Sequence, residues 1–386
     1  MTPGAARWVT LDELRARRSF KWHAQPPDVL PAFIAEMDVT LAPAVARSLV
    51  EAVERGDTGY AFPDPELGTA ASGFQGERFG WNPDPSGISL IPDVMSGIGA
   101  VLRRALPEGG GVVVNTPVYP PFFDHIAAAG CRVVEAPLAR DGSGYALDLD
   151  AVEAALRGGA RAYLLCNPHN PTGLVHSAAE LRRVAGLAER HGALVLSDEI
   201  HAPLTLAGAR HLPYLSLPEA RGRGVSFISA TKGWNLPGLK CAQLVTASEP
   251  MRALAASLSP ELRFGASNLG VIASIAAYRE GGAWLDELLI LIDRNRRLLG
   301  DILADRLPEI GYTPPRATYL AWLDCSALRL GDDPARVFLE RGRVALRPGP
   351  DFGRSGAGWV RATMATAPQT LREIVERMRR AVDTTR

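Results

Sequence analysis

The chain lacks the features that mark nucleic-acid-binding, membrane and secreted proteins. Among its 386 residues, 42 are Lys or Arg and 42 are Asp or Glu, and no block of one sign stands out. The charge pattern therefore favours neither nucleic acid nor a membrane surface as a partner. The longest apolar runs are strand-sized and no charged-then-apolar leader opens the chain, which argues against membrane insertion and secretion. We expect a cytoplasmic protein.

Cysteine is scarce and widely spaced. The four cysteines are Cys131, Cys166, Cys241 and Cys325. Zinc sites and disulfide frameworks need paired or clustered cysteines. We therefore expect no metal site and no disulfides, and a reducing compartment is indicated.

Apolar material is plentiful, at 47% of the residues. A chain of this length suits one large domain plus a smaller one, or two similar domains. Apolar runs predict strands at residues 88–91, 112–115, 131–134, 162–166, 193–196, 226–228 and 241–246, and helical patterns cover 43–55, 96–106 and 178–191. Such strands between helices predict an α/β fold, with a mostly parallel sheet covered by helices on both faces.

The pattern changes after Gly281 and Gly282. A long helix is predicted at 283–307, followed by strands at 319–323, 344–346 and 358–362 and helices at 334–341 and 369–382. We expect three parts: an N-terminal arm over residues 1–42 that contributes to the small domain, a large domain over 43–282, and a small α+β domain over 283–386.

One lysine has the surroundings of a reactive amine. Lys232 lies in the run Ser229-Ala-Thr-Lys-Gly-Trp-Asn-Leu-Pro-Gly-Leu-Lys240, after the apolar run 224–228. Its amine is expected to project from a strand end into a pocket. A lysine amine has a reference pKa of about 10 and becomes a nucleophile only when its charge is suppressed. A surface lysine is the alternative; a lysine in such a pocket is of the kind that anchors pyridoxal 5′-phosphate.

Asp198 is suited to face the ring nitrogen of that cofactor. The ring withdraws electrons while its nitrogen is protonated, which requires a facing anion, and Asp198 follows the strand-like run 193–197. Capping a turn is the alternative use of such an aspartate. His201 is a candidate for hydrogen bonding the phenolic oxygen of the cofactor, or else a structural histidine.

Two proline-rich turns supply further candidates. Asn170 lies in Cys166-Asn-Pro-His-Asn-Pro-Thr-Gly173, where two Asn-Pro steps force a rigid turn. Its amide is a candidate donor to the phenolic oxygen, and a simple turn asparagine is the alternative. Tyr119 lies between prolines in Thr116-Pro-Val-Tyr-Pro-Pro-Phe-Phe123. It is a candidate to stack on the ring or, alternatively, to pack in the core or an interface.

The phosphate requires donors, and an amino-acid carboxylate requires a cation. Gly97 and Ile98 open an apolar helical run, so their amides are expected at a helix N-terminus that binds the phosphate. Arg361 lies in the apolar run 359–363, where an unpaired guanidinium is costly; it is a candidate for gripping a carboxylate, or else part of a structural salt bridge. Further candidates for the phosphate are Ser96, Ser229, Thr231 and Lys240.

Together these motifs resemble the fold-type I pyridoxal phosphate enzymes of the aminotransferase class I/II superfamily over nearly the full length. Within that superfamily, the chain is most similar to the cystathionine β-lyase branch of bacterial C–S lyases. The resemblance implies a mostly parallel seven-stranded sheet sandwiched by helices, plus a smaller α+β domain. The segments that carry it are Phe20-Lys-Trp22, Ala35-Glu-Met-Asp38, Gly59-Tyr60, Pro117-Val-Tyr-Pro-Pro-Phe122, Cys166-Asn-Pro-His-Asn-Pro-Thr-Gly173, Ser197-Asp-Glu-Ile-His201, Ser229-Ala-Thr-Lys232, Thr318-Tyr-Leu-Ala-Trp-Leu323 and Val360-Arg361.

The resemblance also implies roles for single residues. Lys232 is implied to bind the cofactor covalently and Asp198 to pair with the ring nitrogen. Asn170 is implied to contact the phenolic oxygen, Tyr119 to stack on the ring, and Arg361 to hold the substrate carboxylate.

A homodimer with shared active sites is implied as well, in which Tyr60 reaches the phosphate bound by the neighbouring subunit. Substrate contacts are expected from Asp38, Trp234 and Tyr319.

Three positions depart from the family pattern. Lys240 stands where the superfamily usually has arginine, Gly233-Trp234 replaces Ser/Thr-Phe, and Glu36 replaces aspartate. These changes leave the cofactor prediction intact and bear on the substrate, because Trp234 and the N-terminal arm are expected to shape the pocket.

The expected substrate is an amino-acid thioether. With Lys232 as the base that removes the α-proton, β-elimination from a cysteine S-conjugate or cystathionine gives a thiol, pyruvate and ammonia. Transamination by an aminotransferase is the first alternative. A non-catalytic regulatory protein on the same fold is the second.

Overall fold

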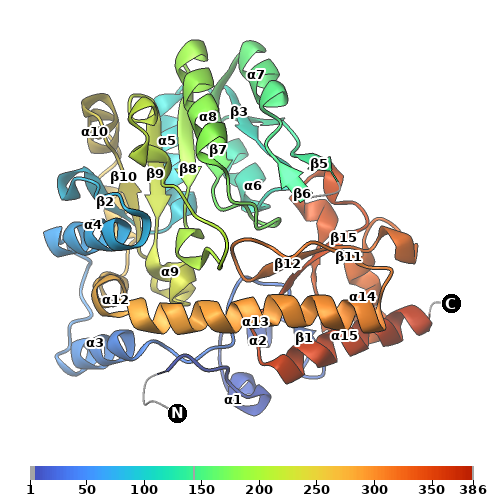
Figure 1. The fold of residues 1–386 in the computed structure, drawn as a ribbon. Coiled ribbons are helices and arrows are strands. Elements are labelled where there is room, and N and C mark those ends of the chain that lie inside the picture. The colour runs from blue at the N-terminus through green and yellow to red at the C-terminus, as the bar shows by residue number, and fades with distance from the viewer. Residues whose placement is uncertain (1–4, 142–143, 385–386) are drawn as a thin grey trace.

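The main feature of the computed structural model, which describes residues 5–141 and 144–384, is a seven-stranded sheet (Figure 1). Its strand order is β2-β10-β9-β8-β7-β3-β4. Neighbouring strands are parallel except that β10 runs against both β2 and β9. The predicted α/β fold with a mostly parallel seven-stranded sheet is therefore confirmed. The strands are β2 (Ile88–Ile91), β3 (Gly111–Val114), β4 (Arg132–Glu135), β7 (Ala160–Cys166), β8 (Leu194–Asp198), β9 (Gly224–Ile228) and β10 (Ala242–Val245).

Helices cover both faces of this sheet, with α7 (Leu149–Arg157) and α8 (Ala178–His191) on one face and α5 (Val94–Ala105) and α6 (Pro121–Ala128) on the other (Figure 1). The side chains of β3 show why both faces need cover. Val112 and Val114 belong to the apolar cluster of α5 and α6, whereas Val113 belongs to the cluster of α7 and α8. Successive side chains of a strand point to opposite faces, so a continuous apolar strand must be buried on both.

A four-stranded antiparallel sheet, in the order β11-β12-β15-β14, forms a second unit next to the long helix α13 (Gly282–Arg306) (Figure 1). Its strands are β11 (Gly311–Tyr312), β12 (Leu320–Asp324), β14 (Arg347–Pro348) and β15 (Trp359–Thr363), and its other helices are α14 (Pro334–Gly342) and α15 (Pro368–Asp383). The N-terminal segment reaches this unit, because β1 (Leu30–Pro31) pairs in parallel with β13 (Val344–Ala345). The division into parts at 42/43 and 282/283 stays a prediction.

Each strand predicted for the large sheet matches an observed strand within two residues at either end. The sequence patterns did not single out α4 (Pro65–Phe79) or α12 (Asn268–Glu280). Helix α4 is rich in glycine and alanine, and its buried residues include Ala70 and Ser72, which lie on nearly opposite sides of the helix. A small-residue helix buried on several sides has no apolar stripe for a periodicity argument to detect.

The remaining elements are short or connect these units. They are α1 (Leu11–Arg15), α2 (Phe20–His23), α3 (Pro43–Glu54), α9 (Ala230–Gly233), α10 (Glu249–Ala256), α11 (Glu261–Phe264), β5 (Ala139–Asp141) and β6 (Gly144–Ala146). Within the described residues, none of the helices has the length and apolar character needed to cross a bilayer.

Candidate active site

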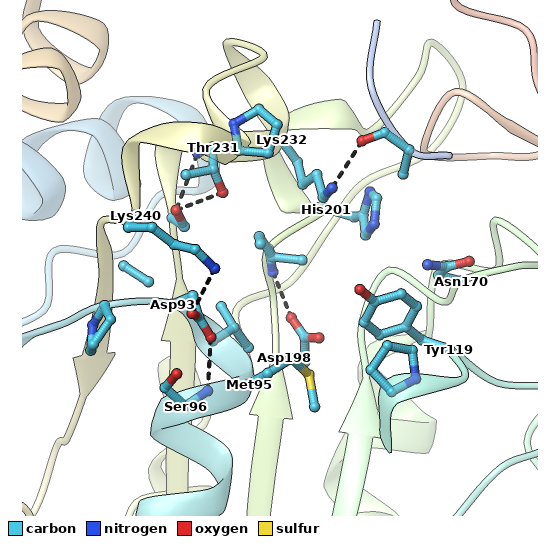
Figure 2. Close-up of a pocket in the computed structure, with 18 of the residues that line it drawn as sticks. Asp93, Met95, Ser96, Tyr119, Asn170, Asp198, His201, Thr231, Lys232 and Lys240 are labelled. Atoms are coloured by element: carbon cyan, nitrogen blue, oxygen red, sulfur yellow. Dashed lines mark hydrogen bonds and ion pairs between the residues drawn. The ribbon is translucent and has the colours of Figure 1, made fainter. Parts of the chain in front are cut away.

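A cavity of about 320 Å³, which we call the inner cavity, lies at the carboxyl ends of the central strands (Figure 2). Asp198 ends β8, Cys166 ends β7 and Ser229 follows β9, so the parallel strands bring distant motifs to one edge of the sheet. The predicted site residues that line this cavity are Ser96, Tyr119, Asn170, Asp198, His201, Ser229, Thr231, Lys232 and Lys240.

A second cavity of about 240 Å³, the outer cavity, adjoins the inner one. Tyr119 and Lys232 line both cavities, and Arg361 lines the outer one. The N-terminal arm closes this side with Phe20, Phe33, Ile34, Ala35 and Glu36. The two cavities therefore place the predicted carboxylate-binding arginine on the side of Lys232 that faces the arm.

Lys232 projects from the short helix α9, which Ser229 caps. The Ser229 hydroxyl accepts a hydrogen bond from the Thr231 amide (3.1 Å) and donates one to the Cys241 carbonyl (2.6 Å). The Lys232 Nζ donates to the Ala35 carbonyl at 2.9 Å (Figure 2). Burial, and next the Arg361 guanidinium, lower the pKa of Lys232 to about 8, so about a tenth of this amine is neutral at pH 7, far more than for a lysine with the reference pKa of about 10.4.

Asp198 is a buried carboxylate, 5% exposed. It accepts a hydrogen bond from the Ile200 amide at 3.1 Å, and burial raises its pKa to about 7, against the opposing influence of Lys232. Among the described residues no cation lies within ion-pair distance of it. A protonated ring nitrogen would supply the missing positive charge, so this carboxylate fits the predicted cofactor.

Glu199, which sequence reasoning passed over, fixes the end of strand β8. Its Oε1 accepts hydrogen bonds from the Ser197 hydroxyl (2.8 Å), the Ser226 hydroxyl (3.1 Å) and the Tyr214 amide (2.9 Å), and its Oε2 lies 3.4 Å from His211 Nε2. These bonds join β8 to β9 beneath the cavity, so they hold Asp198 in place. Nothing in the local sequence marked Glu199, because its partners other than Ser197 come from two distant segments, residues 211–214 and strand β9.

The phosphate-binding prediction at helix α5 needs a correction. The helix begins at Val94, with Asp93 as its N-cap; Gly97 donates its amide to the Asp93 carbonyl at 3.1 Å, and Ile98 is fully buried in the core. Neither residue lines a cavity, whereas Met95 and Ser96 do. The first amides of a helix lack intrahelical acceptors; Val94 and Met95 occupy these positions and line the inner cavity, so they are better candidates for the backbone donors than Gly97 and Ile98.

Asp93 is therefore a site residue that the prediction missed. Its Oδ1 accepts from the Ser96 amide at 2.8 Å and its Oδ2 pairs with Lys240 Nζ at 3.1 Å (Figure 2). An aspartate just before an apolar helical run is an N-cap signature, and this signal was available in the sequence.

Arg361 has polar partners but no anion. Its two Nη groups donate to Asn170 Oδ1 (3.1 Å) and to the Phe33 carbonyl (2.9 Å), while its Nε is buried without an acceptor among the described residues. Burial lowers its pKa to about 10. No carboxylate within the described chain pairs with it, so the salt-bridge alternative is not supported and the guanidinium remains able to bind an external carboxylate.

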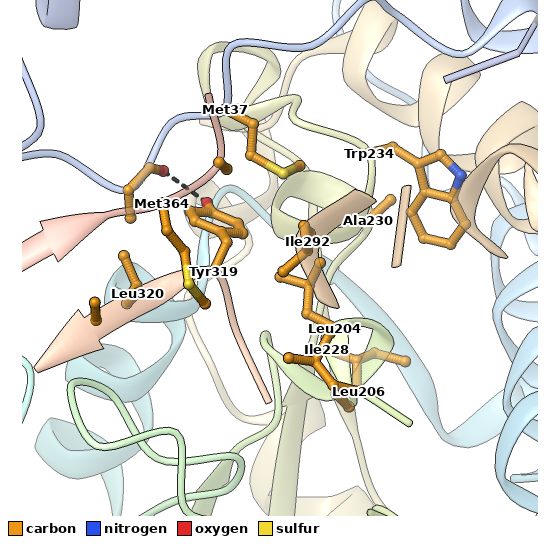
Figure 3. Close-up of a cluster of buried hydrophobic side chains, with 14 of the residues drawn as sticks. Met37, Leu204, Leu206, Ile228, Ala230, Trp234, Ile292, Tyr319, Leu320 and Met364 are labelled. Carbon is orange, nitrogen blue, oxygen red and sulfur yellow. Dashed lines mark hydrogen bonds between the residues drawn. The ribbon is translucent and has the colours of Figure 1, made fainter. Parts of the chain in front are cut away.

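His201 and Tyr319 stand beside Lys232. Burial, followed by the charges of Lys232 and Arg361, holds the pKa of His201 well below its usual value, so its ring is neutral. Tyr319 lines neither cavity; its hydroxyl donates to the Ala35 carbonyl at 2.9 Å (Figure 3). One carbonyl of the arm thus accepts hydrogen bonds from both Tyr319 and Lys232.

The expectation that Asp38 and Trp234 contact the substrate is corrected by their positions. Asp38 is buried and paired with Lys21 at 2.7 Å. Trp234 is fully buried in the apolar cluster shown in Figure 3, packs against Phe74, and donates its indole N–H to the Gly281 carbonyl at 3.1 Å. Both side chains are buried with their polar groups paired inside the chain, and neither lines the inner or the outer cavity.

Tyr60 lies outside both cavities and is 86% exposed, in edge-to-face contact with Phe264 at 6.1 Å between ring centroids. Within one chain it therefore has no contact with the candidate site, and its predicted role across a subunit interface stays a prediction.

A family model for aminotransferase class I and II matches residues 37–378. The chain belongs to this family. Among its relatives, a Mycobacterium leprae protein provisionally named a cystathionine β-lyase is 46% identical over 404 residues, covering 99% of both chains. The cystathionine β-lyase of Corynebacterium glutamicum is 33% identical, covering 96% of this chain and 99% of the relative.

Solved structures agree with this assignment. A Corynebacterium diphtheriae protein, provisionally described as a pyridoxal-phosphate-dependent β-cystathionase, superposes with a TM-score of 0.93 at 35% identity, covering 98% of this chain and 99% of the other. Cystalysin from Treponema denticola, whose crystal structure contains pyridoxal 5′-phosphate, superposes with a TM-score of 0.90 at 25% identity over the full length of both chains. The predicted family, the fold-type I architecture and the cofactor class are confirmed.

Proposed function

We propose that this protein is a pyridoxal 5′-phosphate-dependent C–S β-lyase that cleaves cystathionine or another cysteine S-conjugate, with water, to a thiol, pyruvate and ammonia. The observation that carries the proposal is one system of joined cavities with three unmatched groups. Lys232 has a lowered pKa, Asp198 lacks a cation and Arg361 lacks an anion. The names of the more similar relatives support a lyase.

When bound, pyridoxal phosphate draws electrons away from the α-carbon of an amino acid. The residues of this chain prepare and use that effect. The Asp198 carboxylate keeps the ring nitrogen protonated, and the Lys232 amine anchors the cofactor and then removes the α-proton as a general base. Arg361 holds the substrate carboxylate in the outer cavity, which Lys232 also lines.

The two ends of the cofactor are assigned to the two sides of the inner cavity. The phosphate is held by the Val94 and Met95 amides together with polar side chains around them. Asn170 would hold the phenolic oxygen, because its Oδ1 is bound to Arg361 and its amide NH2 group remains to donate. Tyr119, which lines the inner cavity, would stack on the ring. The side chains assigned to the phosphate are those of Ser96, Ser229, Thr231 and Lys240.

The proposal includes a homodimer in the cytoplasm. Tyr60, Phe62 and Phe264 are large apolar side chains that are 62% to 86% exposed, and such a surface is typical of a protein interface. In the dimer, Tyr60 reaches the phosphate bound by the other subunit. All four cysteines are buried and free, as expected of a protein kept in a reducing compartment.

The test is the release of free thiol and pyruvate from L-cystathionine without any 2-keto acid. We expect turnover by the wild type, and loss of both turnover and visible cofactor absorbance in Lys232→Ala. Lys240→Arg, which restores the residue usual in the superfamily, should keep both.

Transamination is the second candidate, because an LL-diaminopimelate aminotransferase from Syntrophobacter fumaroxidans is 26% identical over 96% of this chain. Conversion of an amino acid only when a keto acid is present, with no thiol released, would favour it over the lyase. A colourless wild-type protein that binds no pyridoxal phosphate would favour the regulatory alternative.

A further inference from the structure

The outer cavity contains two charged side chains that the proposed reaction leaves unused. Of the charged residues that line it, Lys232 and Arg361 have roles, whereas Glu36 and Arg347 have none. Both of these are half-buried. Their contacts within the chain show which of the two leaves a positive charge, and which a negative charge, able to bind a ligand.

Arg347 is the direct cross-strand neighbour of Arg361. The two residues are paired between β14 and β15, so their side chains leave the sheet on the same face, and like charges placed in this way repel each other. Arg347 uses its Nε to bind Asp351 at 2.8 Å, and neither of its Nη groups has a hydrogen-bond acceptor among the described residues. A guanidinium offers five N–H donors, so the open side of Arg347 is free to take a second carboxylate next to the one on Arg361.

Glu36 presents the opposite charge on the arm. Its Oε1 accepts a hydrogen bond from the Ser19 hydroxyl at 2.6 Å. Lys21 is close in the chain, but it binds the Glu36 backbone carbonyl and pairs with Asp38 instead of the Glu36 carboxylate. No cation within the described chain pairs with Glu36, so its carboxylate is able to receive an ammonium group.

We infer that Arg347 and Glu36 form a recognition site for the leaving half of the substrate, and that this half is itself a zwitterion with its own carboxylate and ammonium group. This inference rests on the proposed function, which assigns the carboxylate of the reacting half to Arg361. With that carboxylate placed, the cavity retains one positive and one negative side chain. A neutral alkyl or aryl leaving group would satisfy neither and would contact only the apolar lining of Phe20 and Phe33.

Four thioethers with equal chain length on the leaving side test the inference. L-Cystathionine carries both distal charges, S-(3-carboxypropyl)-L-cysteine only the carboxylate, S-(3-aminopropyl)-L-cysteine only the ammonium, and S-propyl-L-cysteine neither. The holoenzyme, Arg347→Gln and Glu36→Gln are compared by kcat/KM for thiol release and, independently, by calorimetric binding of each thioether. Arg354→Gln, an exposed arginine of the same loop region, is the control.

The readout is the preference for each charged thioether over S-propyl-L-cysteine, because this ratio cancels general effects on folding or on Lys232. We expect Arg347→Gln to lower the preference for the two carboxylate-bearing substrates about tenfold, as for loss of one charge-assisted hydrogen bond. Glu36→Gln should lower the preference for the two ammonium-bearing substrates by a similar factor. Arg354→Gln should change neither ratio.

Two outcomes overturn the inference. In the first, the wild type prefers S-propyl-L-cysteine; in the second, the variants lower kcat/KM by the same factor for all four substrates. The proposed function fails separately. If the wild type releases no thiol from any of the four, the lyase assignment is wrong, and the pattern of binding constants across the variants still decides whether Arg347 and Glu36 recognise the distal charges.

Discussion

Asp198 shows how a single residue of the site should affect stability. Its pKa is about 7 in the native protein and about 3.9 in an unfolded chain. Between these pH values the native state binds more protons than the unfolded state, so the contribution of Asp198 to stability falls as the pH rises through this window. The loss of stability that comes from burying the ionised Asp198 carboxylate reaches its full size above pH 7 and is absent below about pH 4.

We therefore expect cofactor-free Asp198→Asn to resist urea better than cofactor-free wild type at pH 8, by a few kcal/mol as an order of magnitude. The difference should close near pH 4. Urea unfolding at both pH values measures it, with the surface variant Asp332→Asn as a control. A wild type that gains stability over Asp198→Asn between pH 4 and pH 8 would contradict the assignment of a buried, unpaired carboxylate.

The sequence predicted the positions of Lys232 and Asp198 correctly because each follows an apolar strand, and parallel strands bring their ends together. It failed for Asp38 and Trp234 because their surroundings come from distant segments. Lys21 neutralises Asp38, and Phe74 and the Gly281 carbonyl enclose Trp234. The unused charge of Arg347 was hidden for the same reason, since only the pairing of β14 with β15 places it beside Arg361.

At the scale of elements, the N-terminus of α5 is important both for the stability of the helix and for the proposed phosphate site. Asp93 both caps the helix and pairs with Lys240. Asp93→Ala should lose the cap, at a cost of about 1 kcal/mol, and should also release Lys240. Asp93→Asn keeps a capping side chain and loses only the charge.

We expect Asp93→Ala to lower both the midpoint of urea unfolding and the affinity for pyridoxal phosphate, whereas Asp93→Asn should retain most of the unfolding midpoint. Fluorescence titration of the cofactor-free protein with pyridoxal phosphate measures the affinity. Equal unfolding midpoints for Asp93→Ala and wild type would show that the cap contributes nothing.

Elements with a clear apolar period or a continuous apolar run were predictable, and those built from small residues were not. The strands of the large sheet and helix α8 follow the first rule. Helix α4 follows the second, because its glycines and alanines let neighbouring segments approach closely without leaving an apolar stripe. Gly68, for example, would place a side chain against the Pro85 carbonyl.

At the scale of the whole molecule, the proposed dimer depends on the exposed aromatic pair Tyr60 and Phe264. A charge in the centre of an apolar interface is strongly unfavourable. We expect Phe264→Asp to sediment as a monomer at micromolar concentration and to bind pyridoxal phosphate more weakly, because Tyr60 of the second subunit is then absent. Ile290→Asp, at an exposed apolar residue of α13, is the matched control and should remain dimeric. A wild type that sediments as a monomer with full cofactor affinity would overturn both parts.

The Ala35 carbonyl connects the N-terminal arm to the candidate active site, because it accepts hydrogen bonds from both Lys232 and Tyr319. The arm also supplies Phe20, Phe33 and Glu36 to the outer cavity, yet none of the strands of the large sheet comes from it. Replacing the arm side chains Phe20, Phe33 and Glu36 while keeping the backbone at Ala35 should therefore change which molecules fit the outer cavity and leave the strands that carry the rest of the site in place.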